Sequence, residues 1–313
     1  MSVKVFIDGS SGTTGLRIAD RLAQRPEIEL LSISAEGRKD VNERAKVINS
    51  ADLAFLCLPD AASKEVMPLL RPDVKVLDTS TAFRTDAAWD YGFPELKDQK
   101  EKIKHSYRVA VPGCYASGFI SIARPLVELG LAPKGYPFSC TGISGYSGGG
   151  KKMIAEYESA DRPVHSKLDA PKSYGLGLAH KHLPEMKEIS GLAHTPMFVP
   201  VVCDYYCGMQ VLVPLDLTLA GTTAEAVAAG LAEYYKDAAT VKVHALNEAL
   251  PENGLYSNAM AGTDRMELYL TVNAAGDQMM LVSLFDNLGK GSSGAAVQCM
   301  NLMLGLPETE GLE

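Results

Sequence analysis

Residues 3–15 read VKVFIDGSSGTTG, an apolar run followed directly by three glycines spaced three apart. The apolar run has the length of a buried strand, and helical periodicity follows from Leu16 to Leu22. Gly9 allows a tight turn, while Gly12 and Gly15 permit close backbone approach. This stretch therefore predicts a strand, a turn and a helix, which is the first unit of a parallel α/β sheet.

Short apolar runs continue to alternate with helical patterns over the first hundred residues, which predicts a Rossmann-type α/β domain with a parallel sheet. After Cys114 the apolar runs are longer and few helical patterns separate them, which predicts an α+β domain with a mostly antiparallel sheet. The expected strands are Ile28–Ser34, Leu53–Leu58 and Val74–Asp78 in the first domain, and Phe138–Ser144, Phe198–Val201, Met209–Leu217, Val241–His244, Glu267–Val272 and Met279–Phe285 in the second.

We predict two domains, residues 1–113 together with 287–313, and residues 114–286. Residues 293–304 show helical spacing and are expected to return to the first domain. The residues after Pro307 are expected to be a frayed tail.

The composition favours a cytoplasmic protein that acts on small molecules. The 313 residues carry a net charge of −8, which argues against a nucleic-acid or membrane-surface partner. No apolar run approaches the roughly 18–20 residues that span a bilayer, and the chain enters its first strand without a signal peptide. The six cysteines are scattered, as in a reduced compartment, and Cys203 and Cys207 lack a second ligand pair for zinc.

The glycine spacing is a close relative of the dinucleotide-binding fingerprint, in which a pyrophosphate lies on the helix N-terminus. The residues expected to bind the cofactor there are Gly9, Ser11, Gly12, Thr13, Thr14 and Gly15.

The end of the second strand indicates NADP. An NAD-selective site would place an acidic residue there, whereas this chain has Ser34, followed by Arg38 and Lys39. A hydroxyl and two cations suit a 2′-phosphate. Glu36 argues the other way, and a solvated loop remains the alternative.

Cys114 follows Pro112 and Gly113 at the predicted start of a helix. A helix N-terminus lowers the pKa of a thiol and favours the nucleophilic thiolate. The alternative is a small buried cysteine that only packs.

His180 and His182 lie two residues apart, with Glu185 close behind. Metal ligation, general acid/base catalysis and a surface location are all compatible with this spacing. We favour acid/base catalysis and no metal, because no further ligand cluster appears and a thiolate paired with a histidine is a recurrent arrangement.

Several motifs together resemble the N-acetyl-γ-glutamyl-phosphate reductase family, in its shorter form, within the aspartate-semialdehyde dehydrogenase superfamily. The resemblance covers essentially the whole chain. Its blocks are Gly9–Gly15, Asp78–Arg84 (DTSTAFR), Tyr91–Glu95 (YGFPE), Pro112–Tyr115 (PGCY), His180–Glu185 (HKHLPE) and Asp286–Gly291 (DNLGKG).

The resemblance implies NADPH-dependent reduction of an acyl phosphate to a semialdehyde through a Cys114 thioester. It makes His182 the acid/base, gives His180 a supporting or substrate-binding role, and places Asn287 at the nicotinamide and Ser80 at the cofactor. Residues 145–150 are expected to form a flexible loop for an anionic substrate, with a plain surface loop as the alternative. The expected substrate contacts are Ser144, Gly145, Tyr146, Lys151 and His180.

Three alternatives remain open. The chain could be an aspartate-semialdehyde dehydrogenase or an aminoadipyl-phosphate reductase, since an N-acetyl pocket has no local signature. It could also be a non-catalytic dinucleotide-binding regulator, although Cys114 and His182 argue against that. A homo-oligomer, dimer or tetramer, is expected through the second domain.

Overall fold

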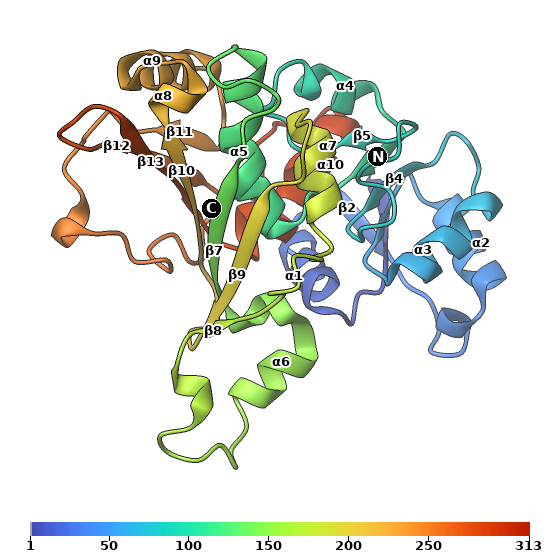
Figure 1. Ribbon diagram of the computed structural model, residues 1–313. Helices are drawn as coiled ribbons and strands as arrows, with labels where there is room; N and C mark the ends of the chain where they lie inside the picture. Colours follow the sequence, from blue (N-terminus) through green and yellow to red (C-terminus); the bar gives the residue numbers. More distant parts are fainter. Residues whose placement is uncertain (1) are drawn as a thin grey trace. The chain divides into compact units, whose positions relative to one another are not determined.

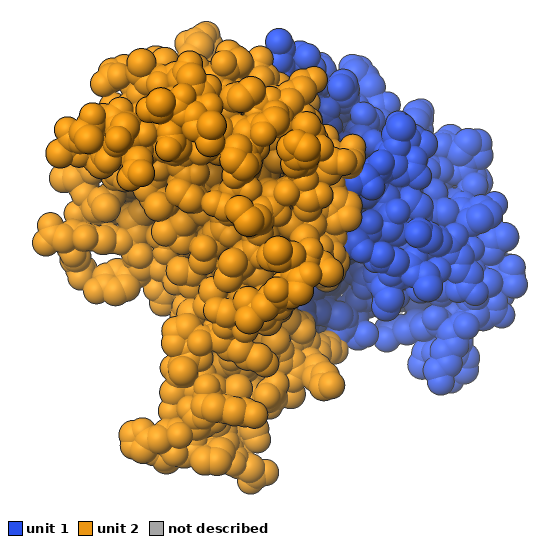
Figure 2. All heavy atoms as spheres, in the orientation of Figure 1, with its two compact units in different colours: residues 1–113, 292–312 blue, residues 114–291, 313 orange. Residues whose placement is uncertain are grey.

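In the computed structural model, which describes residues 2–313, the chain separates into two units (Figure 2). Unit 1 extends to Gly113 and takes in Ser292–Leu312, and unit 2 comprises Cys114–Gly291 and Glu313. Residues 287–291, which the sequence analysis assigns to the first domain, belong to unit 2.

Unit 1 is built on a six-stranded sheet with the order β2-β1-β3-β4-β6-β5, and every pairing in it is parallel. Consecutive residues of each strand face opposite sides of the sheet, so Val5 and Phe6 belong to different core layers. Helices cover both layers, as the alternating pattern predicts. The strands are β1 (Val3–Asp8), β2 (Ile28–Leu31), β3 (Leu53–Leu56), β4 (Lys75–Asp78), β5 (Asp90–Tyr91) and β6 (Arg108–Ala110), and the helices are α1 (Thr13–Leu22), α2 (Val41–Ser50), α3 (Asp60–Val66), α4 (Gln99–His105) and α10 (Gly294–Leu304).

Unit 2 holds a seven-stranded mixed sheet with the order β11-β12-β13-β10-β7-β9-β8. Two pairings, β7 with β9 and β11 with β12, are parallel, and the others are antiparallel. This confirms the predicted fold class. The strands are β7 (Ser139–Gly145), β8 (Lys172–Ser173), β9 (Met197–Cys203), β10 (Met209–Asp216), β11 (Val241–Val243), β12 (Met266–Val272) and β13 (Gln278–Phe285).

The long helix α5 (Cys114–Glu128) packs on β10 and β13, between α7 (Leu183–Ser190) and α9 (Ala224–Tyr234). Gly118 allows this close approach, because a Cβ there would lie 2.6 Å from a methyl group of Val211. Two further helices are α6 (Gly150–Tyr157), which follows β7 after a 3-10 turn, and α8 (Leu217–Ala220), which follows β10 directly. Unit 2 is therefore richer in helix than the sequence patterns indicate.

Residues 146–173 form an arm that projects from the rest of unit 2, drawn in green below its sheet in Figure 1. The arm contains a 3-10 turn (η3, Tyr146–Gly149), α6, a second 3-10 turn (η4, Lys167–Asp169) and β8.

The prediction of a frayed C-terminal tail is wrong. Asn301 donates its amide hydrogens to the carbonyls of Glu308 and Glu310, and Lys100 pairs with the Glu308 carboxylate at 2.6 Å. These contacts hold the tail against unit 1. No helix within residues 2–313 combines the length and apolar character needed to cross a membrane.

Candidate functional site

The first glycine-rich turn joins β1 to α1 in unit 1. Gly9 has φ +88°, and a Cβ there would lie 2.4 Å from the carbonyl oxygen of Cys57. A Cβ on Gly15 would lie 2.4 Å from the carbonyl oxygen of Gly9. Only glycine therefore fits at these two positions, as expected for a strand-to-helix turn of this kind.

The N-terminus of α1 is open to an anion. Its N-cap is Gly12, which has no side chain to accept from the first amides, and the first turn carries no acidic residue. Four backbone N–H groups at a helix start lack partners within the helix, and the helix dipole favours negative charge there. Thr14 lies in this turn, and its hydroxyl contacts that of Ser292 at 3.1 Å.

A cavity of about 350 Å³ adjoins this turn, lined by Gly9, Ser11, Ile33 and Arg38 among others. Arg38 is exposed in the short 3-10 turn after β2 (η1, Gly37–Lys39). The Ser34 hydroxyl accepts from the Gly37 N–H at 3.0 Å, which leaves its own hydrogen to donate. Arg38 therefore contributes a cationic residue to the lining of the cavity. The hydroxyl of Ser34, which follows the lining residue Ile33, can donate a hydrogen bond nearby.

The loop after β4 is held by its own side chains. The Ser80 hydroxyl donates to Asp78 at 2.6 Å and accepts from the Ala82 N–H at 3.1 Å. Burial raises the pKa of Asp78, and the hydrogen bonds from Ser80 oppose this. The hydroxyl of Ser80, an expected cofactor contact, is therefore engaged in shaping the loop.

Arg84 is a buried cation that the sequence analysis does not single out. Its guanidinium donates to the carbonyls of Val111 and Thr79, each at 3.0 Å. The Val111 N–H in turn donates to the Asp78 carbonyl at 2.8 Å. Arg84 thereby braces the backbone three residues before Cys114.

Cys114 is the first residue of α5, where the sequence predicts it, and it is partly exposed. Other thiols have environments that disfavour a thiolate. Burial raises the pKa of Cys57 to about 12 and also raises the pKa of Cys140 and Cys203. Cys299 is buried and donates to the Gly92 carbonyl at 3.4 Å. Cys114 is therefore a better placed nucleophile than these four cysteines.

Tyr115 and both histidines meet in unit 2. The Tyr115 ring centroid lies 5.9 Å from that of His180 and 6.1 Å from that of His182, and the two imidazoles are 4.8 Å apart. Phe198 of β9 packs against Tyr115 and His180 at 5.1 and 5.2 Å. Because Tyr115 directly follows Cys114, this cluster places the two histidines close to Cys114.

The two histidines differ in state. Burial, assisted by the charge of Lys181, lowers the pKa of His180 to about 4, so its imidazole is neutral at pH 7. Its Nδ1 accepts from the His182 N–H at 3.2 Å, so the ring hydrogen is on Nε2. His182 itself is buried at the start of α7, whose first turn carries the buried Glu185.

The second glycine-rich turn follows β7 and differs from the expected flexible loop. The N–H groups of Gly145, Tyr146 and Ser147 donate to carbonyls of the loop that joins β9 to β10 at 2.9–3.0 Å. The Ser144 hydroxyl donates to the Gly145 carbonyl at 3.0 Å. These amides have protein partners, so Gly145, Tyr146 and Ser147 do not present the unbonded N–H groups that the anion-binding loop expected at residues 145–150 would use.

Asn287 reinforces that turn. Its Oδ1 accepts from the Gly208 N–H at 2.8 Å, and its Nδ2 donates to the Ser147 hydroxyl at 3.0 Å. The side chain is buried. The second hydrogen of Nδ2 is not used in these two bonds. The side-chain oxygen already holds the loop that joins β9 to β10 against the turn.

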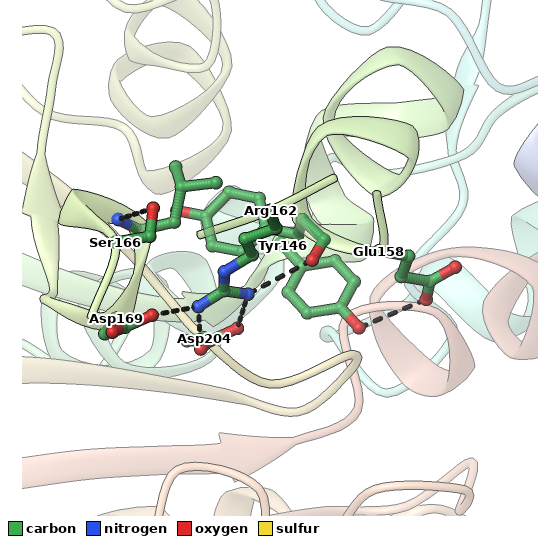
Figure 3. A network of polar contacts seen from close by, with 8 residues as sticks. Tyr146, Glu158, Arg162, Ser166, Asp169 and Asp204 are labelled. Carbon is green, nitrogen blue, oxygen red and sulfur yellow. Dashed lines mark hydrogen bonds and ion pairs between the residues drawn. The ribbon is translucent and has the colours of Figure 1, made fainter. Parts of the chain in front are cut away.

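The arm is fixed at its base by the polar network in Figure 3. Arg162 pairs with Asp204 of the loop that joins β9 to β10 and with Asp169 of the arm. It also donates to the Tyr157 carbonyl at 3.1 Å. Tyr146 stacks on Tyr157 with centroids 4.8 Å apart and donates to Glu158 at 3.1 Å. The Tyr146 side chain therefore packs within the arm, and its expected substrate contact stays a prediction.

Lys151, the other expected substrate contact of this segment, is exposed on α6. Among residues 2–313, the ring contacts and hydrogen bonds of His180 and Tyr115 do not include Lys151. Tyr174, by contrast, does reach the cluster and was missed from the sequence. Its ring lies 5.9 Å from His180 and its hydroxyl donates to that of Tyr115 at 3.4 Å, a pairing that no local pattern indicates.

No set of three or more histidine, cysteine, aspartate or glutamate side chains is arranged to hold a metal ion in the part of the chain that the structure describes.

Comparison with known proteins agrees with this architecture. Residues 4–106 match the family model described as "Semialdehyde dehydrogenase, NAD binding domain", and residues 114–287 match "Semialdehyde dehydrogenase, dimerisation domain". Aspartate semialdehyde dehydrogenase from Francisella tularensis has TM-score 0.70 at 14% identity, covering 96% of this chain and 100% of that one. The corresponding enzyme II of Vibrio cholerae has TM-score 0.68 at 16% identity, covering 97% and 99%. These two structures share the fold.

Sequence relatives are much more similar. N-acetyl-gamma-glutamyl-phosphate reductase of Burkholderia cenocepacia is 47% identical over 96% of this chain and 97% of its own. The protein of the same name from Trichormus variabilis is 46% identical over 99% of both chains. This chain belongs to the N-acetyl-gamma-glutamyl-phosphate reductase family.

Proposed function

We propose that the chain reduces N-acetyl-γ-glutamyl phosphate to N-acetyl-glutamate semialdehyde with NADPH and releases phosphate, as a step of arginine biosynthesis. The observation that carries the proposal is a partly exposed cysteine at a helix start beside a neutral and a buried histidine, in a member of this family.

The reaction starts with attack of the Cys114 thiolate on the acyl carbon. The C–S bond forms as the C–O bond to phosphate breaks, which leaves a thioester and inorganic phosphate. Backbone N–H groups in the first turn of α5 stabilise the developing oxyanion. NADPH, held at the glycine-rich turn before α1, would supply the hydride. The thiohemiacetal on Cys114 then collapses to the aldehyde and the thiolate.

The histidines take different parts. With a pKa of about 4, the His180 imidazole is already neutral at pH 7 and cannot act as a general acid there. His180 instead donates a hydrogen bond from its neutral Nε2–H and so orients a substrate oxygen. His182 accepts the thiol proton, donates it to the oxyanion formed by hydride addition, and takes it back as the thiohemiacetal collapses to the aldehyde and the thiolate. Glu185, buried in the same helical turn, supports the imidazolium.

We further propose that unit 1 binds the cofactor, and that NADP is preferred over NAD. The open N-terminus of α1 suits the pyrophosphate. The exposed Arg38 and the donor hydroxyl of Ser34 suit the 2′-phosphate. Unit 2 is catalytic, and it supplies the interface of a homo-oligomer, dimer or tetramer, in line with the dimerisation-domain model that it matches.

The test is a side-by-side assay of N-acetyl-glutamate and aspartate semialdehydes with phosphate and NADP. We expect turnover of the first only. Cys114→Ala should abolish it while NADPH still binds, and EDTA should have no effect on the wild type. A thioester trapped on another cysteine, or activity lost on removal of a stoichiometric metal, would refute the mechanism.

The pH profile separates the histidines. His182→Asn should lower kcat about 10²–10⁴-fold and remove the ionisation of this imidazole from the pH profile of kcat/KM. His180→Asn should raise KM at least as much as it lowers kcat and leave that ionisation in place, because His180 titrates at about pH 4. The reverse pattern would exchange the two roles.

A further inference from the structure

Tyr174 adds a phenol oxygen to the cluster around Cys114. It follows β8, and its N–H donates to the Pro200 carbonyl of β9 at 3.1 Å, which fixes its backbone against the sheet. Its ring lies 5.9 Å from the ring of His180 at an angle of 61°, and its hydroxyl lies 3.4 Å from that of Tyr115. Tyr174 therefore belongs to the ring cluster formed by Tyr115 and His180, next to Cys114 in sequence.

The hydrogens of the two phenols have a fixed direction. The Tyr115 hydroxyl bonds the Val201 carbonyl at 3.2 Å, and a carbonyl only accepts, so Tyr115 uses its single hydrogen there. The oxygen of Tyr115 must then accept the hydrogen of Tyr174. The Tyr174 oxygen is left as an acceptor in a chain of hydrogen bonds that ends at Val201.

This acceptor is neutral. Burial raises the pKa of Tyr174, and a negative charge on Cys114 raises it further, while the contact with Tyr115 opposes the shift. The neighbouring imidazole of His180 is neutral as well. A partly buried neutral oxygen suits an amide N–H, and it provides no charge to match an ammonium group.

An N-acylated glutamyl phosphate is rich in acceptors, namely phosphoryl, carboxylate and carbonyl oxygens. At neutral pH the amide N–H is the one hydrogen-bond donor of this molecule, apart from a proton on the phosphate. We propose that the Tyr174 oxygen accepts this amide N–H, and so selects N-acylated substrates over those with a free α-amino group. The inference rests on the proposed function and names a specificity-determining residue for it.

The test combines a change in the enzyme with a change in the substrate. Tyr174→Phe and the wild type are assayed with N-acetyl-glutamate semialdehyde and with 5-oxopentanoate, which has the same chain without the acylamino group. We expect the variant to lose about 3- to 10-fold in kcat/KM on the first substrate, as for one neutral hydrogen bond, and less than about twofold on the second. Equal losses on both substrates overturn the inference.

Two controls keep a structural effect apart. Tyr205→Phe removes another partly buried phenol hydroxyl, which contacts Ser257 at 2.6 Å, and should leave the ratio between the two substrates unchanged. The pH profile of Tyr174→Phe should match that of the wild type, because the phenol transfers no proton. A changed ratio in Tyr205→Phe or a shifted profile in Tyr174→Phe would contradict the assignment.

The wild type provides a test that needs no variant. N-acetyl-N-methyl-glutamate semialdehyde lacks the amide hydrogen and should be a poorer substrate by a similar 3- to 10-fold factor. Wild-type efficiency with this analogue equal to that with the parent aldehyde overturns the inference. Absence of turnover of the parent aldehyde overturns the proposed function itself, so the two failures are distinguishable.

Discussion

The chain has two glycine-rich turns that follow strands, and the structure treats them in opposite ways. The turn from Gly9 to Gly15 leads into α1 with no acidic residue in the first helical turn. In the turn from Gly145 to Gly149, the first three N–H groups donate to carbonyls of the loop that joins β9 to β10. Glycine content alone therefore does not indicate an anion site. The partners of the amides decide it, and they are supplied by distant parts of the chain.

The largest effect is expected from closing the open turn. Gly9→Ala places a methyl group 2.4 Å from the Cys57 carbonyl oxygen at φ +88°, so the turn must shift. We expect NADPH affinity to fall by at least 100-fold in fluorescence titration, with a lower Tm. Gly12→Ala is the graded partner, because its Cβ would meet the Gly9 oxygen at 3.3 Å, and it should fold and bind more weakly. Unchanged NADPH binding in Gly9→Ala would disprove the location.

Arg38 tests what the open turn binds. A charge-assisted contact contributes about 1.5–3 kcal/mol, which corresponds to roughly 10–150-fold between cofactors. Arg38→Ala should erode the preference for NADPH by that factor and leave NADH kinetics nearly unchanged. The ratio of kcat/KM values measures this directly. A wild type that uses NADH equally well would contradict the assignment.

Asn287 tests what keeps the second turn closed. Asn287→Ala leaves the buried Gly208 N–H without its acceptor, at a cost of about 1–3 kcal/mol. We expect Tm to fall by about 2–10 °C, while the KM for NADPH rises only slightly. Asn287→Asp keeps the acceptor and should recover part of the stability. If the KM for NADPH rises tenfold with no loss of Tm, the side chain serves the nicotinamide instead.

The smallest effect is expected at Lys151. This residue is exposed on the arm, outside the ring contacts that join Tyr115 to the histidines. Lys151→Ala should change KM for phosphate and for the semialdehyde by less than about twofold, with Lys152→Ala as the matched control. A tenfold rise in KM for Lys151 alone would restore the arm to substrate binding.

Local patterns predicted the parts of the molecule that depend on local geometry. The strand–turn–helix at Gly9 follows from backbone sterics, and the start of α5 at Cys114 follows from the preceding Pro-Gly. The strand limits were less accurate, since β2 ends at Leu31 and β3 at Leu56. There the pattern read from the sequence continues into residues that lie outside the strands of the sheet.

Side chains joined across long stretches of sequence could not be predicted in this way. Tyr174 meets Tyr115 over a separation of 59 residues, and Asn287 meets Ser147 over 140. Each pair depends on the order of strands in the sheet, which periodicity does not encode. The histidine spacing likewise left three interpretations open, and the separate environments of His180 and His182 appear only in the folded chain.

The position of α10 has a consequence for synthesis on the ribosome. One face of the unit 1 sheet is completed by residues at the far end of the chain, where Ala296, Val297 and Met300 join the core around Val5 and Phe55. A nascent chain has therefore made every strand of this sheet long before the helix that covers that face emerges. Until α10 has been synthesised, the apolar face must be shielded by other means, so molecular chaperones or late docking of α10 are expected to govern the yield of folded protein.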